Sequence, residues 1–499
     1  MLAANGEECG DLAAVLLPLT EDHRGCDEGM GVDEMLRRFV GEFGPWQLRQ
    51  FLLASIAWAL NALHTMVVVF ANRDPDGRDS CSAAPLPGWR AVSTVEEWGL
   101  TCGGERFKVG LAQTAFFSGA MIGAAIFGHL SDTFLGRKGA LTLSSSLNAT
   151  FGILTAFSPA FWSYAALRFL TGLSTGGVGL SAFVLATEPV GPTRRASVAM
   201  STFFFFSIGA SILSLIAFFV PSWRLLYIAT SFPSVLFIFL ALPFISESPR
   251  WHHVRRNHSA AMSIMLEIAK TNGSTIPDRA YLVPVDSGSS TASIFDVLQS
   301  PLTRSRLLLA VAINLLGSVV YYGLTLNVGS LGTDLHFAVV MNAVAELPAY
   351  AMTAVALRWC GRRPMTTGTL WLSGASCIAG GMLVGNGQVL MAARLLCAAV
   401  GIFAEAGGFD LLYIYTAELF PTVVRNAALG CVTLAGQLGA MAAPMVVAAG
   451  GRWPFVVFGA CGMAAGALGW FLPETCNRPL YETLEALEGG EAEKPSAGG

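Results

Sequence analysis

Twelve long apolar runs alternate with polar segments along the chain, and each run has about the length that a membrane-spanning helix needs. About 20 mainly apolar residues are required, because each residue of a helix adds about 1.5 Å across a hydrocarbon core of about 30 Å. The runs lie near residues 50–71, 108–130, 139–159, 161–187, 197–219, 224–245, 306–327, 336–357, 366–384, 388–413, 427–449 and 453–472. The pattern predicts an all-α membrane protein with twelve transmembrane helices.

The polar segments between the runs define the predicted domains. These are an N-terminal segment (1–45), a first six-helix bundle (46–245), a polar linker (246–303), a second six-helix bundle (304–473) and a C-terminal tail (474–499). Most lysines and arginines fall in the end segments, in the linker and in the short loops on the same side. By the positive-inside rule, both termini and the linker are expected in the cytoplasm. No cleavable signal peptide is expected, because no basic start with a short apolar core precedes the first run.

The composition narrows the class of protein. Charged residues make up 13% of the chain, against about 25% in soluble proteins, so lipid is expected to surround much of its surface. The net charge of -4 provides no basic field for nucleic acid, and no glycine-rich nucleotide loop indicates ATP-driven transport. Neither a metal site nor a cofactor is expected. Cys81 and Cys102 share one polar loop and could pair if that loop faces an oxidising compartment.

The two halves of the sequence repeat the same glycine and charged positions at a nearly constant spacing. The repeated positions are Gly136-Arg137-Lys138 with Gly361-Arg362-Arg363, Arg168 with Arg394, Glu188 with Glu418, Arg195 with Arg425, and Glu247 with Glu474. Several matches at one offset indicate two six-helix halves of common design, which is typical of secondary transporters.

Several stretches of the sequence resemble a known transporter family. GHLSDTFLGRK at 128–138 resembles the loop motif between spans two and three of the major facilitator superfamily. EEWGLTC at 96–102 and YTAELFPTVVRN at 415–426 are similar to its organic ion transporter branch, and ESPRW at 247–251 is shared by that branch and the related sugar porters. FGPWQL at 43–48 is similar to the plant organic cation/carnitine transporters. The resemblance covers nearly the whole chain.

This resemblance implies the major facilitator fold, with two pseudo-symmetric bundles, and a secondary active transporter that works by alternating access. It further implies small organic cations or zwitterions such as carnitine as the solute, and a proton or a sodium ion as the coupling ion. The plasma membrane is favoured over the vacuolar membrane, and no enzymatic activity is expected. Two alternatives remain open: an organic anion or sugar transporter on the same fold, and a membrane receptor that does not transport.

The resemblance also implies a gating role for charged residues at the ends of the spans. Asp132 can face the N-terminus of span eleven, whose dipole is worth about half a positive charge. Arg137 and Lys138 can pair with Glu188 or Glu418 across the interface between the bundles. The other members of this predicted set are Gly128, Gly136, Arg195 and Arg425. The alternative is that the basic residues only hold the loops in the cytoplasm.

Arg168 and Arg394 lie inside predicted spans, near the outer helix end. A guanidinium in a span must find a partner or reach the membrane interface. Two roles remain open for them: a lock between the bundles on the outer side, and snorkelling toward the lipid headgroups.

Three carboxylates inside predicted spans are candidates for the solute site. Glu346 in span eight and Glu405 in span ten are near the middle of the membrane, and we expect Glu405 to face the cavity. Asp410 follows Glu405 by five residues, so it points roughly 140° away on a helix. A carboxylate there could supply the counter-charge for a cation or bind a coupling proton. The alternative for Glu346 is a structural hydrogen bond between helices.

Aromatic and neutral polar residues complete the predicted solute site. Tyr321 and Tyr322 can offer ring faces to a quaternary ammonium group, at about 0.5–2 kcal/mol each. His64 could relay a proton, although packing is the commoner role of such a histidine. Gln437 occupies the position in span eleven where animal members often carry a charge, so the sign of the solute does not follow from that position.

Overall fold

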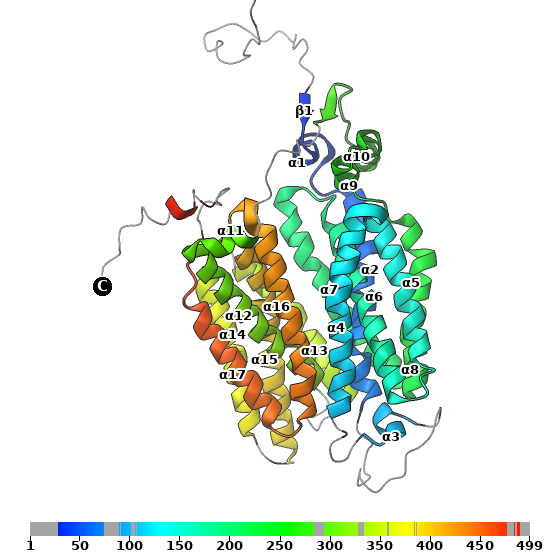
Figure 1. Cartoon of the computed structure of the whole chain (residues 1–499), viewed down its shortest axis with the longest axis vertical. Helices are drawn as coiled ribbons and strands as arrows, with labels where there is room; N and C mark the ends of the chain where they lie inside the picture. Colours follow the sequence, from blue (N-terminus) through cyan, green and yellow to red (C-terminus); the bar gives the residue numbers. More distant parts are fainter. Residues whose placement is uncertain are drawn as a thin grey trace, which may run out of the picture.

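Twelve long helices stand in two groups, side by side, in the computed structural model (Figure 1). The structure describes residues 28–73, 89, 91–100, 105, 107–283, 294–327, 334–356, 359–383, 385, 387–476, 484 and 487–489. The first bundle contains α2 (Pro45–Ala71), α4 (Phe107–Leu130), α5 (Gly136–Thr155), α6 (Phe161–Thr187), α7 (Pro192–Phe219) and α8 (Trp223–Leu240). The second contains α12 (Pro301–Leu326), α13 (Leu335–Ala356), α14 (Arg362–Met382), α15 (Gln388–Leu419), α16 (Thr422–Ala448) and α17 (Trp453–Gly469). The predicted fold class is confirmed. The predicted pairing of Cys81 with Cys102 falls outside the described residues.

Apolar surface covers the outside of both bundles. In the described part of the chain, nine helical stretches are long and apolar enough to cross a membrane, and one of them, Phe107–Thr155, contains both α4 and α5. α17 is a shorter apolar helix, and α14 completes the set of twelve. Phe219, Phe239 and Val389 are between 72% and 82% exposed, which is favourable only if lipid covers them.

Proline and glycine set where several of the helices begin. Proline occupies the first turn of α2, α7, α12 and α17, where its missing N–H costs no hydrogen bond. α2 begins at Pro45 rather than near residue 50, because its first turn is polar and hydropathy alone does not reveal it. Gly136 begins α5 with a φ of +72°, a conformation that residues with a side chain disfavour.

Glycines bring α4 close to α6 inside the first bundle. A Cβ atom on Gly119 would lie 2.0 Å from the Phe169 carbonyl oxygen, and one on Gly123 would lie 1.8 Å from a carbonyl oxygen one turn further along α6. Gly128, expected in the gating set, also faces α6, where its Cβ would lie 3.1 Å from Leu180. Small residues allow such close approach between helices in lipid. This contact positions α4, which in turn packs against α16 of the second bundle, while α7 packs against α13.

A small domain, here called the cap, covers one end of the first bundle (Figure 1). It consists of β1 (Glu28–Met30), α1 (Val32–Met35), the π-turn Leu36–Val40, α9 (Pro249–Val254), α10 (His258–Asn272) and β2 (Ala280–Leu282). The two strands pair in parallel, and Met35, Leu36 and Met265 are buried together in the core of the cap. The cap therefore joins the predicted N-terminal segment to the predicted linker.

The two ends of the bundles differ in what lies on them. We call the end with the cap and α11 (Ile294–Gln299) the terminal face, because the described residues nearest both termini lie there (Figure 1). We call the opposite end the α3 face, after α3 (Thr94–Trp98). Glu97 of α3 forms a buried ion pair with Arg224 of α8 at 2.5 Å and accepts a hydrogen bond from the Trp223 indole at 2.9 Å. These bonds fasten α3 to the first bundle.

Candidate functional site

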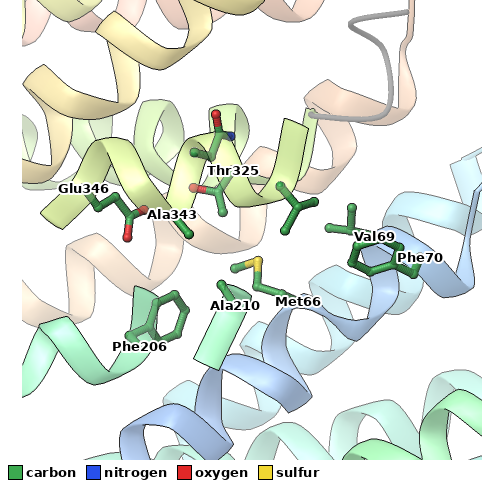
Figure 2. A pocket seen from close by; sticks show the side chains of 10 residues that line it. Met66, Val69, Phe70, Phe206, Ala210, Thr325, Ala343 and Glu346 are labelled. Atoms are coloured by element: carbon green, nitrogen blue, oxygen red, sulfur yellow. The ribbon is translucent and has the colours of Figure 1, made fainter. Parts of the chain in front are cut away.

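A cavity lies between the two bundles, next to the carboxylate of Glu346 (Figure 2). Its walls come from α2 and α7 of the first bundle and from α12 and α13 of the second. They are formed by Met66, Val69, Phe70, Phe206, Ala210, Thr325, Val339, Asn342, Ala343 and Glu346. The cavity volume is about 20 Å³, and one water molecule needs about 10–15 Å³. In this conformation the space is mostly apolar, carries one carboxylate and is too narrow for an organic solute.

Glu346 of α13 is buried and accepts hydrogen bonds from both bundles. The Ser207 hydroxyl of α7 donates to it from the first bundle. The Tyr321 hydroxyl of α12 donates at 3.1 Å and the Tyr350 hydroxyl, one turn along α13, at 3.4 Å. The three hydroxyls replace part of the water that the carboxylate loses on burial. Of these partners the sequence indicated only Tyr321; Ser207 had a signal, because it is a polar residue directly after a run of four phenylalanines.

Aromatic rings surround this carboxylate. Tyr321 stacks on Phe409 of α15, with ring centroids 5.5 Å apart. Tyr322 packs edge to face against Phe117 of α4 at 4.8 Å, and so contacts the other bundle. The two predicted tyrosines therefore have different positions: Tyr321 orients Glu346, and Tyr322 lies in the contact between the bundles.

The other two carboxylates of the predicted solute site lie in different surroundings, as their angular separation on α15 requires. Asp410 is buried and interacts electrostatically with Glu346 and with Tyr350. Glu405 instead faces the interior of the second bundle, toward Gly317 of α12, where a Cβ atom would lie 3.0 Å from its Oε1. The expectation that Glu405 faces the cavity is wrong in this conformation, and Asp410 is the residue of α15 that approaches Glu346.

Arg168 lies wholly inside the first bundle. Its Nη1 donates to the His64 carbonyl at 2.9 Å, its Nη2 donates to Gln113 at 2.6 Å, and its guanidinium lies 4.2 Å from the Phe116 ring centroid. Both expected roles, the lock between the bundles and the snorkelling, are therefore wrong for Arg168, because a carbonyl, an amide and an aromatic ring hold its guanidinium in place. Its Nε has no hydrogen-bond partner among the described residues. The His64 ring is buried in the same bundle, where its Nε2 lies 3.0 Å from the Ser234 hydroxyl, away from the cavity.

Arg394 and Gln437 also stay outside the cavity. The Arg394 guanidinium donates to the Leu383 carbonyl at 2.6 Å and to the Gly385 carbonyl at 2.8 Å. A cation there complements the negative end of the α14 dipole, so Arg394 caps a helix of its own bundle and does not link the two. Gln437 is half-buried on α16, next to Gly436, which lies against Ser318 of α12.

Contacts near the α3 face join the two bundles. The Thr114 hydroxyl of α4 donates to the Met441 carbonyl of α16 at 2.9 Å. His336, at the start of α13, stacks on Phe70 of α2 with ring centroids 5.0 Å apart. Its Nδ1–H donates to the Ser214 carbonyl of α7 at 3.2 Å, and the Ser214 hydroxyl donates to the His336 carbonyl at 3.1 Å. The interface between the bundles is therefore closed at the α3 face.

At the terminal face of the first bundle, charged groups hold three helix ends together. Arg137 pairs with Asp132 at 2.9 Å and with Glu188, at the end of α6, at 3.1 Å. The backbone N–H groups of Arg137 and of the next residue donate to Glu247 at 3.0 and 3.1 Å, so this carboxylate caps the start of α5. A Cβ atom at position 136 would lie 2.3 Å from a Glu247 oxygen and would displace this carboxylate, and the φ of +72° also favours glycine there.

The second bundle repeats this arrangement. Arg362 pairs with Glu418, at the end of α15, at 3.1 Å. The backbone N–H groups of Arg362 and Arg363 donate to Glu474 at 2.8 and 3.1 Å, and a Cβ atom on Gly361 would lie 2.3 Å from a Glu474 oxygen. The repeat seen in the sequence therefore has a shared structural basis.

The ion pairs of this set form within each bundle rather than between the bundles. Arg137 binds Glu188 of its own bundle, and Glu418 binds an arginine of the second. The Lys138 ammonium donates to the Pro243 carbonyl at 3.3 Å, again within the first bundle. The expected pair of Arg137 with Glu188 forms, but it lies within the first bundle. The expectation that Arg137 and Lys138 pair across the interface is wrong for this conformation, in the part of the chain that the structure describes.

Asp33 of the cap extends the network of the first bundle. It pairs with Arg195 at 2.5 Å and also with Arg250, whose Nε donates to the Glu188 carbonyl at 2.7 Å. Burial raises the Asp33 pKa, but the hydrogen bonds and charges of the two arginines outweigh it and hold the pKa below its ordinary value. Arg425 corresponds to Arg195 in the second bundle, and its Nε and Nη2 are buried without a hydrogen-bond partner among the residues that the structure describes. No sequence signal pointed to Asp33.

Comparisons with known proteins agree with this architecture. The sequence profile described as "Sugar (and other) transporter" matches residues 52–487. The chain is 50% identical to the organic cation/carnitine transporter 4 of Arabidopsis thaliana, over 98% of this chain and 97% of that protein. It is 33% identical to a solute carrier family 22 member 15-like protein of Xenopus tropicalis, over 92% and 96% of the two chains. The inward-open xylose transporter XylE from E. coli has the same fold, with a TM-score of 0.64 at 17% identity over 88% of this chain and 99% of that one.

Proposed function

Because the chain belongs to the sugar (and other) transporter family of the major facilitator superfamily, we propose that it carries small organic cations or zwitterions such as carnitine across a membrane. Its family and relatives are transporters and not enzymes, and the family that the motifs indicated is confirmed. The solute class is supported by the relatives named organic cation/carnitine transporters, one of which is identical at half of the aligned positions.

The observation that carries the proposal is the buried carboxylate of Glu346 at the wall of the cavity between the bundles. An ammonium group that enters there meets a counter-charge and the rings of Phe70 and Phe206, which attract a cation through their faces. Asp410 interacts electrostatically with Glu346, so a second acidic side chain lies in the same region. One carboxylate and no cation among the residues that line the described cavity favour a positively charged group over an anion.

Alternating access gives the contacts between the bundles a role in this proposal. The interface closed at the α3 face is one end state, and opening the His336 and Thr114 contacts would expose the cavity to that side. The Arg137, Glu188, Arg362 and Glu418 ion pairs hold the helix ends of each bundle, so each bundle can rock as one body. In the opposite state the terminal faces would approach, and Arg425 would be available for a partner on the first bundle.

The orientation and membrane are finer parts of the same proposal. The excess of lysine and arginine on the terminal face supports a cytoplasmic location of that face, of both termini and of the linker. The contacts at the α3 face would then describe a carrier that is closed to the outside. The plasma membrane remains our choice over the vacuolar membrane, and a proton or a sodium ion remains the candidate coupling ion.

Uptake measurements test the proposed function. Cells that express the chain, and cells that carry the empty vector, receive radiolabelled carnitine, tetraethylammonium, p-aminohippurate or xylose, at two external pH values. We expect uptake of carnitine or tetraethylammonium above the vector control, and competition between them. Uptake of p-aminohippurate or xylose alone would overturn the cationic assignment. If no solute is taken up at normal surface expression, the alternative of a membrane receptor that does not transport would be favoured.

A further inference from the structure

Glu405 is a carboxylic acid enclosed in the second bundle, and it has no cationic partner among the residues that the structure describes. Its side chain is fully buried in α15. Neither of its oxygens makes a hydrogen bond to any residue in the described ranges, although the Ser373 hydroxyl of α14 is close enough to interact with it. Glu346, by contrast, accepts hydrogen bonds from three hydroxyls. Both carboxylates are buried, but in the described part of the chain only Glu346 has hydroxyl groups that donate hydrogen bonds to it.

Apart from the Ser373 hydroxyl, the described groups that face Glu405 offer nothing that would stabilise a negative charge. α14 faces it with the thiol of Cys377, and α17 faces it with the thiol of Cys461. α12 faces it with Gly317, which has no side chain. The acidic groups of α13 and α15 near the cavity, Glu346 and Asp410, interact with each other instead.

An ionised carboxylate in such a place would lose its hydration and receive at most the Ser373 hydroxyl in return, at a cost of several kcal/mol. If the side chain at this position only filled space, an apolar residue of similar volume would stabilise the protein more than a glutamate does. The enclosed state is therefore the neutral acid, with the proton on one Glu405 oxygen. The same residue can ionise only when a movement of α15 brings water to it.

We propose that Glu405 is the proton-binding site that couples solute transport to a proton gradient; this inference rests on the proposed function. On the side of higher proton concentration, a carboxylate oxygen of Glu405 takes a proton from a hydronium ion. In the alternate state the O–H bond breaks, and the proton passes to water on the other side. One proton then crosses with the solute in each cycle, and the carboxylate is regenerated.

α15 provides the link between the two events. It carries Glu405 inside the second bundle and Asp410, next to Glu346, on the side of the cavity. A solute that displaces Asp410 therefore acts on the helix that encloses Glu405. Gly407 and Gly408 lie between the two carboxylates, and their missing side chains let Thr353 of α13 and Thr369 of α14 pack closely on α15. A displacement of α15 at Asp410 would therefore change the packing around Glu405.

The test separates exchange of solute from its accumulation. Glu405→Gln keeps the shape of the neutral acid but cannot release a proton. Proteoliposomes with the purified full chain would receive labelled carnitine or tetraethylammonium in two assays: counterflow without a pH gradient, and accumulation driven by an imposed pH gradient, with an enclosed pH dye as a second readout. We expect driven accumulation to fall by about ten-fold or more, whereas counterflow falls by about three-fold at most.

Controls decide what each outcome means. Glu34→Gln makes the same chemical change at the exposed surface of α1, where Glu34 pairs with Arg38 at 2.8 Å, and should leave both assays unchanged. Glu405→Asp retains an acid and should retain driven accumulation with an altered pH dependence. The proposal is overturned if Glu405→Gln accumulates solute like the wild type, or if neither variant keeps either activity at normal yield, as a packing residue would behave. A wild type that shows counterflow without proton movement also overturns it, whereas a wild type without counterflow overturns the proposed function itself.

Discussion

The Ser207 hydroxyl of α7 donates a hydrogen bond to the Glu346 carboxylate of α13, and this one bond joins the two bundles beside the cavity. The tyrosine partners of Glu346 belong to the second bundle, so they move with it when the bundles rock. Of the three hydrogen bonds to Glu346, only the one from Ser207 crosses between the bundles and must break when they separate. A cation that binds Glu346 can replace the serine as its partner from the other side, which couples occupancy to the freedom of the bundles to separate.

Replacement of Glu346 should therefore affect cations more than the fold. We expect Glu346→Gln to raise the KM for a cationic solute by about ten-fold or more, because the counter-charge is lost while the hydroxyls keep an acceptor. Concentration-dependent uptake of tetraethylammonium measures this change. Ser207→Ala is the matched variant: it removes the bond between the bundles but keeps the charge, so it should change the turnover more than the KM. Equal effects on both parameters in both variants would contradict the division of roles.

The contact between Ser214 and His336 predicts a reversible block of transport. The two residues exchange hydrogen bonds through their backbone carbonyls at the closed α3 face. Cysteines at both positions, in a background without reactive native thiols, should form a disulfide on mild oxidation, because α7 and α13 already touch at these residues. We expect solute uptake to stop after oxidation and to return after reduction. Each single cysteine variant serves as the control, and uptake that survives complete cross-linking would show that this contact does not need to open.

The sequence predicted the twelve helices and the two-fold repeat, because both depend on local patterns. Apolar length determines the spans, and the repeated Gly-Arg and Glu positions return in space as matching ion pairs at 137 and 362. The partners of buried charged residues were harder to predict from the sequence. The sequence left Arg168 as either a lock between the bundles or a residue that snorkels to the lipid headgroups, yet a carbonyl oxygen, Gln113 and an aromatic face bind it inside one bundle. Which side of α15 faces the cavity depends on the rotation of this helix, and glycines and apolar residues surround both carboxylates in the sequence. The sequence therefore did not reveal that Glu405 faces the interior of the second bundle, and it left the position of Asp410 open.

Gly136 and Gly361 allow the effect of backbone strain to be measured separately from a clash. Both approach a capping glutamate equally closely, but only Gly136 has a positive φ, at +72°. Alanine at either position displaces the glutamate, and at 136 it adds about 1–2 kcal/mol of strain. We expect Gly136→Ala to lower the melting temperature of the purified protein by several degrees more than Gly361→Ala does. Equal losses would mean that the cap contact, and not the backbone conformation, requires glycine.

Asp33 predicts how the cap responds to acid. Its pKa lies below the ordinary value of 3.8, because Arg250 and Arg195 favour the charged form more than burial disfavours it. A depressed pKa means that the unfolded chain takes up the proton first, so the stabilisation is complete above the ordinary value and is lost as the pH falls through the lower, folded value. The side chain is 47% exposed, so water screens the pairs and their contribution is below about 1 kcal/mol.

Asp33→Asn should reproduce the acid effect at neutral pH. The neutral amide cannot pair with the arginines, so we expect faster hydrogen exchange in α1 and β2 at pH 7, with the membrane helices unchanged. Since the wild type loses the same pairs only below its ordinary pKa, the difference between the two proteins should stay constant from pH 7 to about 5 and shrink below about 4. Glu34→Gln, in the same helix but away from Arg195 and Arg250, provides the control. A difference that grows on acidification would mean that Asp33 stabilises the cap in its uncharged form. The pairs with the two arginines would then contribute nothing to the stability of the cap.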